Sequence, residues 1–262
     1  MTVESVPIRV EPVEVLVNGR WPVKMPPHRA ERPEWHTPPY WEGARLNRMW
    51  EVVSGLTRKY EGATGTTFYD GPTIWDVGAE EGDMPALYST WGADVVLIEP
   101  NPRVWPCIRY HWTANDLPGP AGCFVGLVGS PEQVNDVWTD PLYEGWPEPA
   151  LSDVMWPAHG FHHLQDYATV DPVTTLDALL PYFPTPDVIT ADIEGGEGHM
   201  LAGATTMLSD IRPVWFVSVH STFMRDMYNQ DPQTFVFDVF ARHGYDRDLI
   251  EDRHEAHWIF TP

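Results

Sequence analysis

Lysine, cysteine and long apolar runs are all scarce in this 262-residue chain. Its 16 basic residues stand against 38 acidic ones, and only Lys24 and Lys59 are lysines. Nucleic-acid binding relies on clustered basic side chains, so this balance argues against a nucleic-acid partner. The two cysteines, Cys107 and Cys123, are too few for a disulfide scaffold and lack the C-x-x-C spacing of a zinc site. We expect both to be reduced and buried.

The chain has no stretch of about 18 apolar residues, and its N-terminus lacks a basic start followed by an apolar block. These absences predict a cytoplasmic protein with no membrane partner. The length of 262 residues suits one α/β core with additions.

Proline is frequent in residues 1–40, which include the pairs Pro26-Pro27 and Pro38-Pro39. Because proline restricts the preceding residue to extended geometry, we expect an extended arm here, with "VEVLV" as an edge strand or hairpin. Apolar residues at helical spacing then predict a helix over about 42–60. Residues 1–70 are therefore expected to form an arm and helix ahead of a domain at 71–262.

From Thr73 onward, short apolar strands alternate with helical segments, which predicts a parallel sheet covered by helices. The expected strands are "TIWDVG", "ADVVLIEP", "GCFVGLVG", "PDVITADI", "PVWFVSVH" and "AHWIFTP", with helices near 83–91, 102–114, 174–181, 197–208 and 232–243. The predicted class is α/β, a doubly wound Rossmann-like sheet that is mostly parallel with an antiparallel last strand. Residues 131–171, rich in aromatics and proline, predict an insertion.

The turn after the first of these strands is strongly acidic. Its four carboxylates are those of Asp76, Glu80, Glu81 and Asp83. They would repel a phosphate, and G-x-G-x-x-G is absent, which argues against NAD and an oxidoreductase. Glu99 closes the next strand 21 residues after Gly78, the spacing at which an acid receives ribose hydroxyls. A cationic nucleoside such as S-adenosylmethionine fits, with its ammonium and sulfonium facing Asp76.

Glu81 and Asp83 also have a simpler explanation. Both lie at the start of a predicted helix, where acidic side chains complement the helix macrodipole.

Two blocks, in order, resemble the FkbM-type methyltransferase family. They are "TIWDVGAEEGDMPALYSTWGADVVLIEPNP" and "VTTLDALLPYFPTPDVITADIEGGEGHMLAGATTML". The first matches the family's "DVGAN-x-G"-like turn and "EP-x-P"; the second, more specific, matches "T-L-D" and "K-I-D-V-E-G-x-E-x-x-x-L-x-G-A". Glu80 replaces the family's usual Asn, Thr190 replaces its Lys, and "EGGEG" carries extra glycines. The resemblance implies transfer of a methyl group from S-adenosylmethionine to a hydroxyl, commonly on a sugar or a sugar-bearing natural product.

The expected cofactor-binding residues lie in the first turn, after the second strand and at the end of the third. They are Asp76, Gly78, Ala79, Glu80, Gly82, Glu99, Pro100, Asn101, Leu127 and Val128. For Leu127 and Val128, packing on adenine and a plain core position are equally open.

Asp192 and His220 end neighbouring strands, so we expect them to meet at the acceptor as catalytic residues. An alcohol is a poor nucleophile and needs a general base or a metal. With Glu194, the pair forms a candidate site for Mg or Mn. Alternatively, Asp192 and Glu197 cap the following helix and His220 is a hydrogen-bonded residue at the end of the strand.

The insertion supplies candidate acceptor contacts, since indole rings suit the C–H faces of sugars. These residues are Trp138, Trp146, Trp156, His162 and His163. A buried aromatic cluster is the alternative. His254 and His257 are three residues apart, not the four of H-E-x-x-H. We expect them to be exposed, and the alternative is that one of the two reaches the site from the last hairpin.

The expected partner is a small-molecule or glycan acceptor, and a homo-oligomer is left open. The main rival is a non-catalytic nucleoside- or glycan-binding module with the same fold. A nucleic-acid methyltransferase is disfavoured by the charge.

Overall fold

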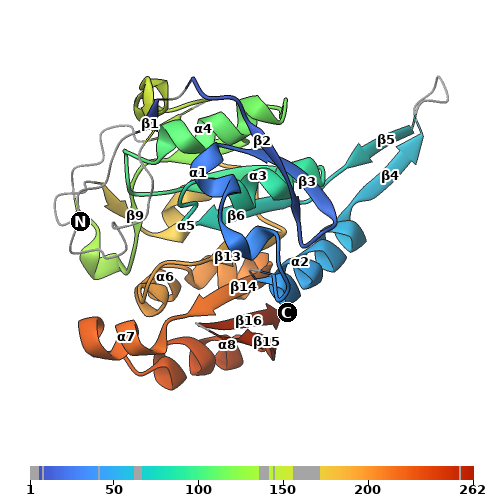
Figure 1. Cartoon of the computed structure of the whole chain (residues 1–262). Coiled ribbons are helices and arrows are strands. Elements are labelled where there is room, and N and C mark those ends of the chain that lie inside the picture. Colours follow the sequence, from blue (N-terminus) through green and yellow to red (C-terminus); the bar gives the residue numbers. More distant parts are fainter. Residues whose placement is uncertain are drawn as a thin grey trace.

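The computed structural model describes residues 6–7, 9–40, 42–61, 67–135, 142–143, 145–155, 172–253 and 255–262. Within these ranges the chain forms a central sheet of eight strands in the order β10-β8-β7-β6-β13-β14-β16-β15, covered by helices on both faces (Figure 1).

Six of the eight described central strands lie where the sequence predicts them, and β10 and β15 are additional. Their bounds are β6 (Thr73–Val77), β7 (Asp94–Ile98), β8 (Gly122–Phe124), β10 (Leu142–Tyr143), β13 (Val188–Ala191), β14 (Val214–Val219), β15 (Asp246–Asp252) and β16 (Ala256–Thr261). Strands β8, β7, β6, β13 and β14 are mutually parallel, and β16 runs antiparallel between β14 and β15. The predicted doubly wound sheet with an antiparallel last strand is therefore confirmed.

Side chains alternate between the two faces of the sheet, as strand geometry requires. One face packs against α2 (Gly43–Leu56), α3 (Asp83–Thr90) and α4 (Trp105–Ala114). The other packs against α5 (Leu176–Leu179), α6 (Glu197–Ala202), α7 (Ser221–Tyr228), α8 (Asp238–Arg242) and the π-helical segments η5 (Met207–Ile211) and η6 (Gln233–Phe237). None of the described helices is long and apolar enough to cross a membrane.

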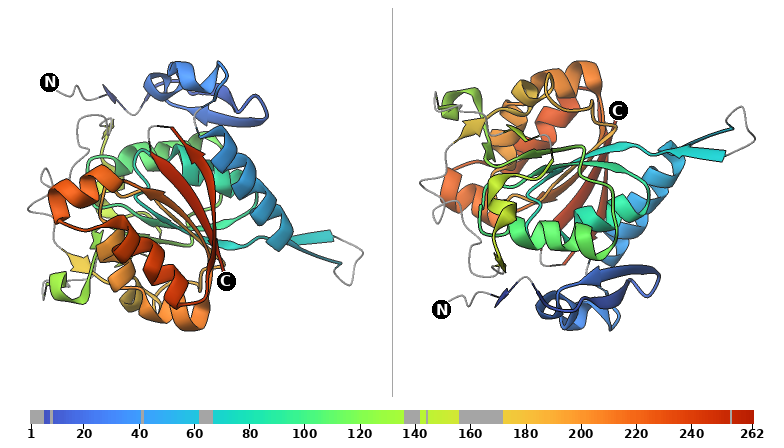
Figure 2. Two further views of the ribbon diagram at one scale, coloured as in Figure 1. Left: turned by 90° about the horizontal axis from the view of Figure 1, so that it is seen from below. Right: turned by 90° about the horizontal axis from the view of Figure 1, so that it is seen from above.

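Several element boundaries differ from the predictions. The predicted helix over 42–60 ends at Leu56, and the chain continues into a hairpin, β4 (Arg58–Glu61) and β5 (Thr67–Asp70), that projects from the body (Figure 2). Strand β15 was not predicted, because "DRDLIED" is mostly polar and exposed. The predicted helix over 197–208 is divided, since α6 ends before Gly203.

The predicted third strand is also divided. It ends at Phe124, and Leu127–Val128 form β9, which pairs in parallel with β12 (Val173–Thr174) in a separate two-stranded sheet. Gly126 explains the break, because a Cβ there would come within 2.6 Å of the Phe124 ring and 2.7 Å of a backbone carbonyl. Leu127 and Val128 therefore do not end a central strand.

The expectation of an extended arm over residues 1–40 is wrong for residues 9–40. This segment forms the predicted hairpin, β2 (Val13–Val17) and β3 (Trp21–Met25), then α1 (Pro27–Ala30) and the 3₁₀ turn η1 (Pro33–Trp35). Two of its prolines, Pro27 and Pro33, stand at the first position of α1 and η1, where no N–H is needed. Val15, Val23, Met25 and Trp35 are buried in the core that includes α3 and α4.

The remaining elements lie near the predicted insertion. They are β1 (Val6–Pro7), which pairs with β11 (Val154–Met155), and the 3₁₀ turns η2 (Pro131–Gln133) and η3 (Glu148–Leu151). The boundary at residue 70 and the extent of the insertion stay predictions.

Candidate active site

A row of polar side chains crosses the carboxyl ends of the central strands on the face that packs against α2. Strand register places Thr190 of β13 beside Asp76 of β6, and Ser218 of β14 beside His257 of β16. The same face is apolar deeper in the sheet, at residues such as Ile74. Because every second side chain of a strand lies on the same face of the sheet, the residues that follow the apolar core positions on this face belong to the candidate site.

Asp192 and His220 meet at the ends of β13 and β14, as the strand order predicts. The His220 Nε2 atom lies 3.4 Å from Asp192 Oδ1 and 3.7 Å from Glu194 Oε2. Its Nδ1 lies 2.8 Å from Oε1 of the fully buried Glu197. The three predicted metal-site residues are thus close together.

The protonation of this pair differs from the simplest expectation of a histidine base. Burial alone would lower the pKa of His220, but hydrogen bonds to Glu197 and Glu255 and the charge of Asp192 raise it to about 12. Burial and the charge of Glu255 raise the pKa of Asp192 well above its usual range. Without a bound cation, the surrounding carboxylates therefore favour the charged form of His220, and burial favours the protonated form of Asp192.

Glu255 and His257 belong to this site, although sequence reasoning missed the first and expected the second to be exposed. Glu255 makes an ion pair with His220 Nε2, and its Oε1 lies 3.5 Å from His257 Nε2. His257 is only 2% exposed, and its Nδ1 lies 2.9 Å from Ser218 Oγ. Glu255 lies directly before β16 and His257 is two residues later, so the two-residue spacing at the start of a predicted strand was the available signal. His254 lies outside the described residues.

The glycine turn after β6 packs directly on the end of β13. Gly78 and Gly82 have φ of +88° and +90°, and a Cβ on Gly78 would come within 2.1 Å of the Asp192 carbonyl oxygen. Glu80 is also left-handed, with φ of 48°, a conformation that Asn tolerates better than Glu. Glu at position 80, where the family has Asn, therefore makes this left-handed backbone conformation less favourable in energy.

Glu99 joins this turn to the end of β7. Its Oε2 accepts the Glu80 N–H at 2.9 Å, and its Oε1 accepts the Asn101 N–H at 2.7 Å. Burial nevertheless raises the pKa of Glu99 to about 8, against the lowering effect of these two hydrogen bonds. Glu80, Glu99 and Asn101, all predicted cofactor residues, are thus linked in one loop structure.

The N-terminal segment neutralises the acidic turn, which sequence reasoning did not foresee. Glu81 and Asp83 are buried, and the Arg29 Nε donates to Asp83 Oδ2 at 2.8 Å. Arg29 Nη1 lies 3.6 Å from Glu81 Oε1, and His28 Nε2 lies 2.7 Å from Glu81 Oε2. The helix dipole is therefore not the whole explanation for Glu81 and Asp83, and neither carboxylate needs a ligand as its counter-charge.

A second N-terminal guanidinium, that of Arg45 in α2, lies beside the row of polar residues. It is ion-paired with Glu42, and its Nη2 donates to Thr190 Oγ1 at 2.5 Å. Burial raises the pKa of Asp76 to about 7, while the charge of Arg45 lowers it. Positive charge is thus brought to Thr190, where the resembling family carries lysine. The signal was an arginine on the buried stripe formed with Met49 and Val53.

Other predicted site residues are not joined to this network. Leu127 and Val128 are half-buried on β9, and Trp146 packs edge-on against Trp112 with ring centroids 5.8 Å apart. Four predicted acceptor residues lie outside the described ranges: Trp138, Trp156, His162 and His163.

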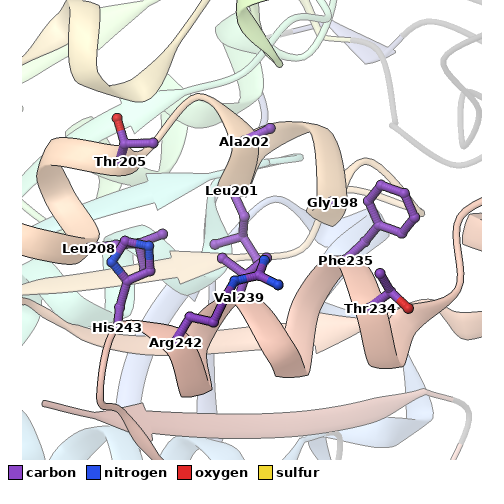
Figure 3. Close-up of a pocket in the computed structure, with 10 residues that line it drawn as sticks. All are labelled: Gly198, Leu201, Ala202, Thr205, Leu208, Thr234, Phe235, Val239, Arg242 and His243. Atoms are coloured by element: carbon purple, nitrogen blue, oxygen red, sulfur yellow. The ribbon is translucent and has the colours of Figure 1, made fainter.

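A separate cavity of about 300 Å³ lies in the helical layer of the opposite face (Figure 3). Its lining residues come from α6, η5, η6, α8 and their connections: Gly198, Leu201, Ala202, Thr205, Leu208, Thr234, Phe235, Val239, Arg242 and His243. None of them is a predicted site residue, so this cavity is not the candidate active site.

Sequence comparison assigns the family. The family model described as the methyltransferase FkbM domain matches residues 76–247. The chain belongs to the FkbM methyltransferase family. Membership implies S-adenosylmethionine as methyl donor and agrees with the earlier resemblance. No curated protein matches the sequence.

Solved methyltransferases are similar to this FkbM-family chain. An FkbM methyltransferase from Methylobacillus flagellatus KT has 18% identity and a TM-score of 0.45, covering 84% of this chain and 53% of its own. This chain therefore spans only about half the length of that protein. A precorrin-6y C5,15-methyltransferase from Geobacter metallireducens GS-15 has 10% identity and a TM-score of 0.42, covering 85% and 90%. A methyltransferase from Pyrococcus furiosus has 12% identity and a TM-score of 0.39, covering 84% and 82%.

The residues at the ends of β6 and β7 fit the chemistry of S-adenosylmethionine. A carboxylate has about four lone-pair positions, and two backbone N–H groups use only part of this capacity at Glu99. The remaining lone pairs of Glu99 are suited to accept hydrogen bonds from the two hydroxyls of a ribose. Asp76, whose pKa burial raises to about 7, would gain from a neighbouring ammonium or sulfonium.

Replacing Arg29 with Met should lower the free energy of unfolding by about 3–5 kcal/mol, because Glu81 and Asp83 would stay buried without their guanidinium. Urea unfolding followed by circular dichroism measures this. The control is Arg48→Met, whose pair with Glu51 is 44% and 63% exposed. Arg48→Met should lower the free energy of unfolding by less than about 1 kcal/mol. Equal losses in the two variants would contradict a stabilising role for Arg29.

The free energy of unfolding should fall as pH rises from about 5 to 8. The folded chain keeps a proton on Glu99 up to a pKa of about 8, whereas the unfolded chain releases it near 4.5, so raising the pH favours unfolding. Glu99→Gln should remove on the order of 2 kcal/mol of this dependence. Urea titrations at several pH values test it, and an unchanged slope in the variant would assign the effect to other groups.

Proposed function

We propose that this chain is an S-adenosylmethionine-dependent O-methyltransferase that acts on a hydroxyl of a sugar, a glycan or a glycosylated natural product. The observation that carries the proposal is the division of the strand ends into two adjacent sets. Asp76 and Glu99 lie at the ends of β6 and β7, and Asp192 and His220 at the ends of β13 and β14.

The first set is assigned to the methyl donor. Glu99 receives the ribose hydroxyls, and Asp76 faces the positively charged methionyl end. The glycine turn brings the donor against the Asp192 backbone, since Gly78 approaches its carbonyl closely. The methyl group therefore lies toward the second set.

The second set is assigned to the acceptor. The hydroxyl oxygen attacks the methyl carbon in line with the carbon–sulfur bond, whose electron pair stays on sulfur. The hydroxyl proton passes to the Asp192 carboxylate, giving a methyl ether, S-adenosylhomocysteine and a protonated carboxyl group. His220, whose Nδ1 lies 2.8 Å from Glu197 Oε1, positions Asp192 and Glu255 rather than accepting the proton.

The hydroxyl is favoured because its proton must be removed during transfer and the Asp192 side chain, partly exposed beside His220, is placed to receive it. The sugar is favoured by the family resemblance and by the aromatic composition of residues 131–171. A divalent cation, Mg or Mn, at the end of β13 also belongs to this proposal.

The alternative is a nucleoside- or glycan-binding module without turnover. One observation favours it: His220 is already engaged by the carboxylates of Asp192, Glu194, Glu197 and Glu255. A histidine that is already surrounded by four carboxylates can have a purely structural role. This protein would bind the donor but would form no product with any acceptor.

Calorimetric titration with S-adenosylhomocysteine tests the donor side. Glu99→Ala should weaken binding by about 10- to 100-fold, which corresponds to about 1.4–2.8 kcal/mol. Asp94→Ala is the matched control, since Asp94 is an exposed acid at the opposite end of the same strand. Absence of binding by the unaltered protein would contradict the proposal.

Methyl transfer from tritiated S-adenosylmethionine to a panel of sugars and glycans tests the acceptor side. Asp192→Ala should abolish turnover and leave S-adenosylhomocysteine binding largely intact, because the carboxylate lies on the acceptor side. Full turnover in this variant would refute the acceptor assignment. Donor binding without product from any acceptor would favour the binding module.

A further inference from the structure

We infer that Asp192, His220 and Glu255 together bind one divalent cation of the Mg or Mn class. Compared with the sequence-based set, Glu255 from the C-terminal hairpin replaces Glu194 as the third ligand. The site is a property of the folded chain, and its role beside an acceptor hydroxyl rests on the proposed function.

The three side chains converge from three different strand ends. Asp192 follows β13, His220 follows β14 and Glu255 precedes β16. One ligand atom from each lies within 4.8 Å of the others. Two carboxylate oxygens and one imidazole nitrogen form a ligand set suited to a hard divalent cation, with the nitrogen favouring Mn over Mg.

Each of the three ligands is held by a partner behind it. His220 is oriented through Nδ1, which lies 2.8 Å from Glu197 Oε1; its Nε2, which makes an ion pair with Glu255 here, would release its proton on coordinating the cation. Asp192 Oδ2 accepts a hydrogen bond from Ser218 Oγ at 3.2 Å. Glu255 Oε1 lies 3.5 Å from His257 Nε2. A carboxylate on the second nitrogen of a ligating histidine is a recurrent feature of metal sites.

The outer partners are themselves fixed. Glu197 Oε1 also accepts the Gly195 N–H at 3.1 Å, and Ser218 Oγ lies 2.9 Å from His257 Nδ1. Ser218 and Glu197 are fully buried. The ligand atoms are therefore held in one arrangement before any cation arrives.

One side of the cluster remains open. The side chains of Asp192 and Glu194 are 29% and 37% exposed, whereas those of His220 and Glu255 are 7% and 9% exposed. A cation held by three protein ligands needs further oxygen ligands, which water or an acceptor hydroxyl would provide from this side. Bound there, it would lower the pKa of that hydroxyl.

Two other groups in the described residues satisfy the same distance condition: Glu42, Glu255 and His257, in which Arg45 already makes an ion pair with Glu42, and His28, Glu81 and Cys107. There, however, Arg29 makes an ion pair with Glu81 and already supplies the positive charge. At the strand ends the guanidinium of Arg45 is hydrogen-bonded to Glu42 and Thr190, and its charge acts on Asp192 without a direct hydrogen bond. This difference favours Asp192, His220 and Glu255 as the cation site.

Titration of the full chain with Mn²⁺, followed by loss of the free-ion signal in electron paramagnetic resonance, tests the inference without cofactor or acceptor. We expect one site, with Mg²⁺ competing for it. Glu255→Gln and Asp192→Asn should each weaken Mn²⁺ binding at least tenfold. Asp252→Asn, an exposed charge on the same hairpin, should change it less than twofold.

Circular dichroism and S-adenosylhomocysteine binding check that each variant is folded, and they separate this inference from the proposed function. No saturable Mn²⁺ binding by the unaltered protein at millimolar concentration would overturn the cation site even if the methyl donor binds. Retained affinity in both Glu255→Gln and Asp192→Asn would overturn it as well. Loss in both, with Asp252→Asn unchanged, would establish it.

Discussion

Buried carboxylates at the carboxyl edge of the sheet need positive charge beside them, and much of this structure follows from that constraint. An isolated buried carboxylate is strongly disfavoured. The chain meets the constraint at the acidic turn with Arg29, beside Thr190 with Arg45 and at the acceptor end with His220. Two of these three cations come from the N-terminal 56 residues, before the family match begins at residue 76.

This arrangement gives the N-terminal segment a part in the site. Its hairpin and helical turns pack on α3 and α4, and that packing carries Arg29 to the turn that precedes α3. Helix α2 packs on the sheet and carries Arg45 to the end of β13. The proposed ligands would add positive charge beside the remaining carboxylates, the methyl donor beside Asp76 and the cation beside Asp192 and Glu255.

Much of the central fold and part of the site could be predicted from residue patterns. Apolar strands separated by helical segments indicated the parallel sheet, and residues that close strands, such as Glu99 and Asp192, marked its functional edge. Strand β15 was not predicted because its side chains are mostly exposed and polar. Glu255 escaped because its partner His220 lies 35 residues away in the chain, and only the pairing of β16 with β14 brings them together.

The sequence by itself determined the sheet, the family and the position of the acidic turn, because these depend on local periodicity and short motifs. Tertiary structure alone decided what neutralises that turn, which histidines are buried and which acid completes the cluster at His220. These contacts join residues far apart in the chain, such as Arg29 with Asp83 and Arg45 with Thr190. Local sequence patterns do not predict these contacts, since they arise only when separate elements pack on one face of the sheet.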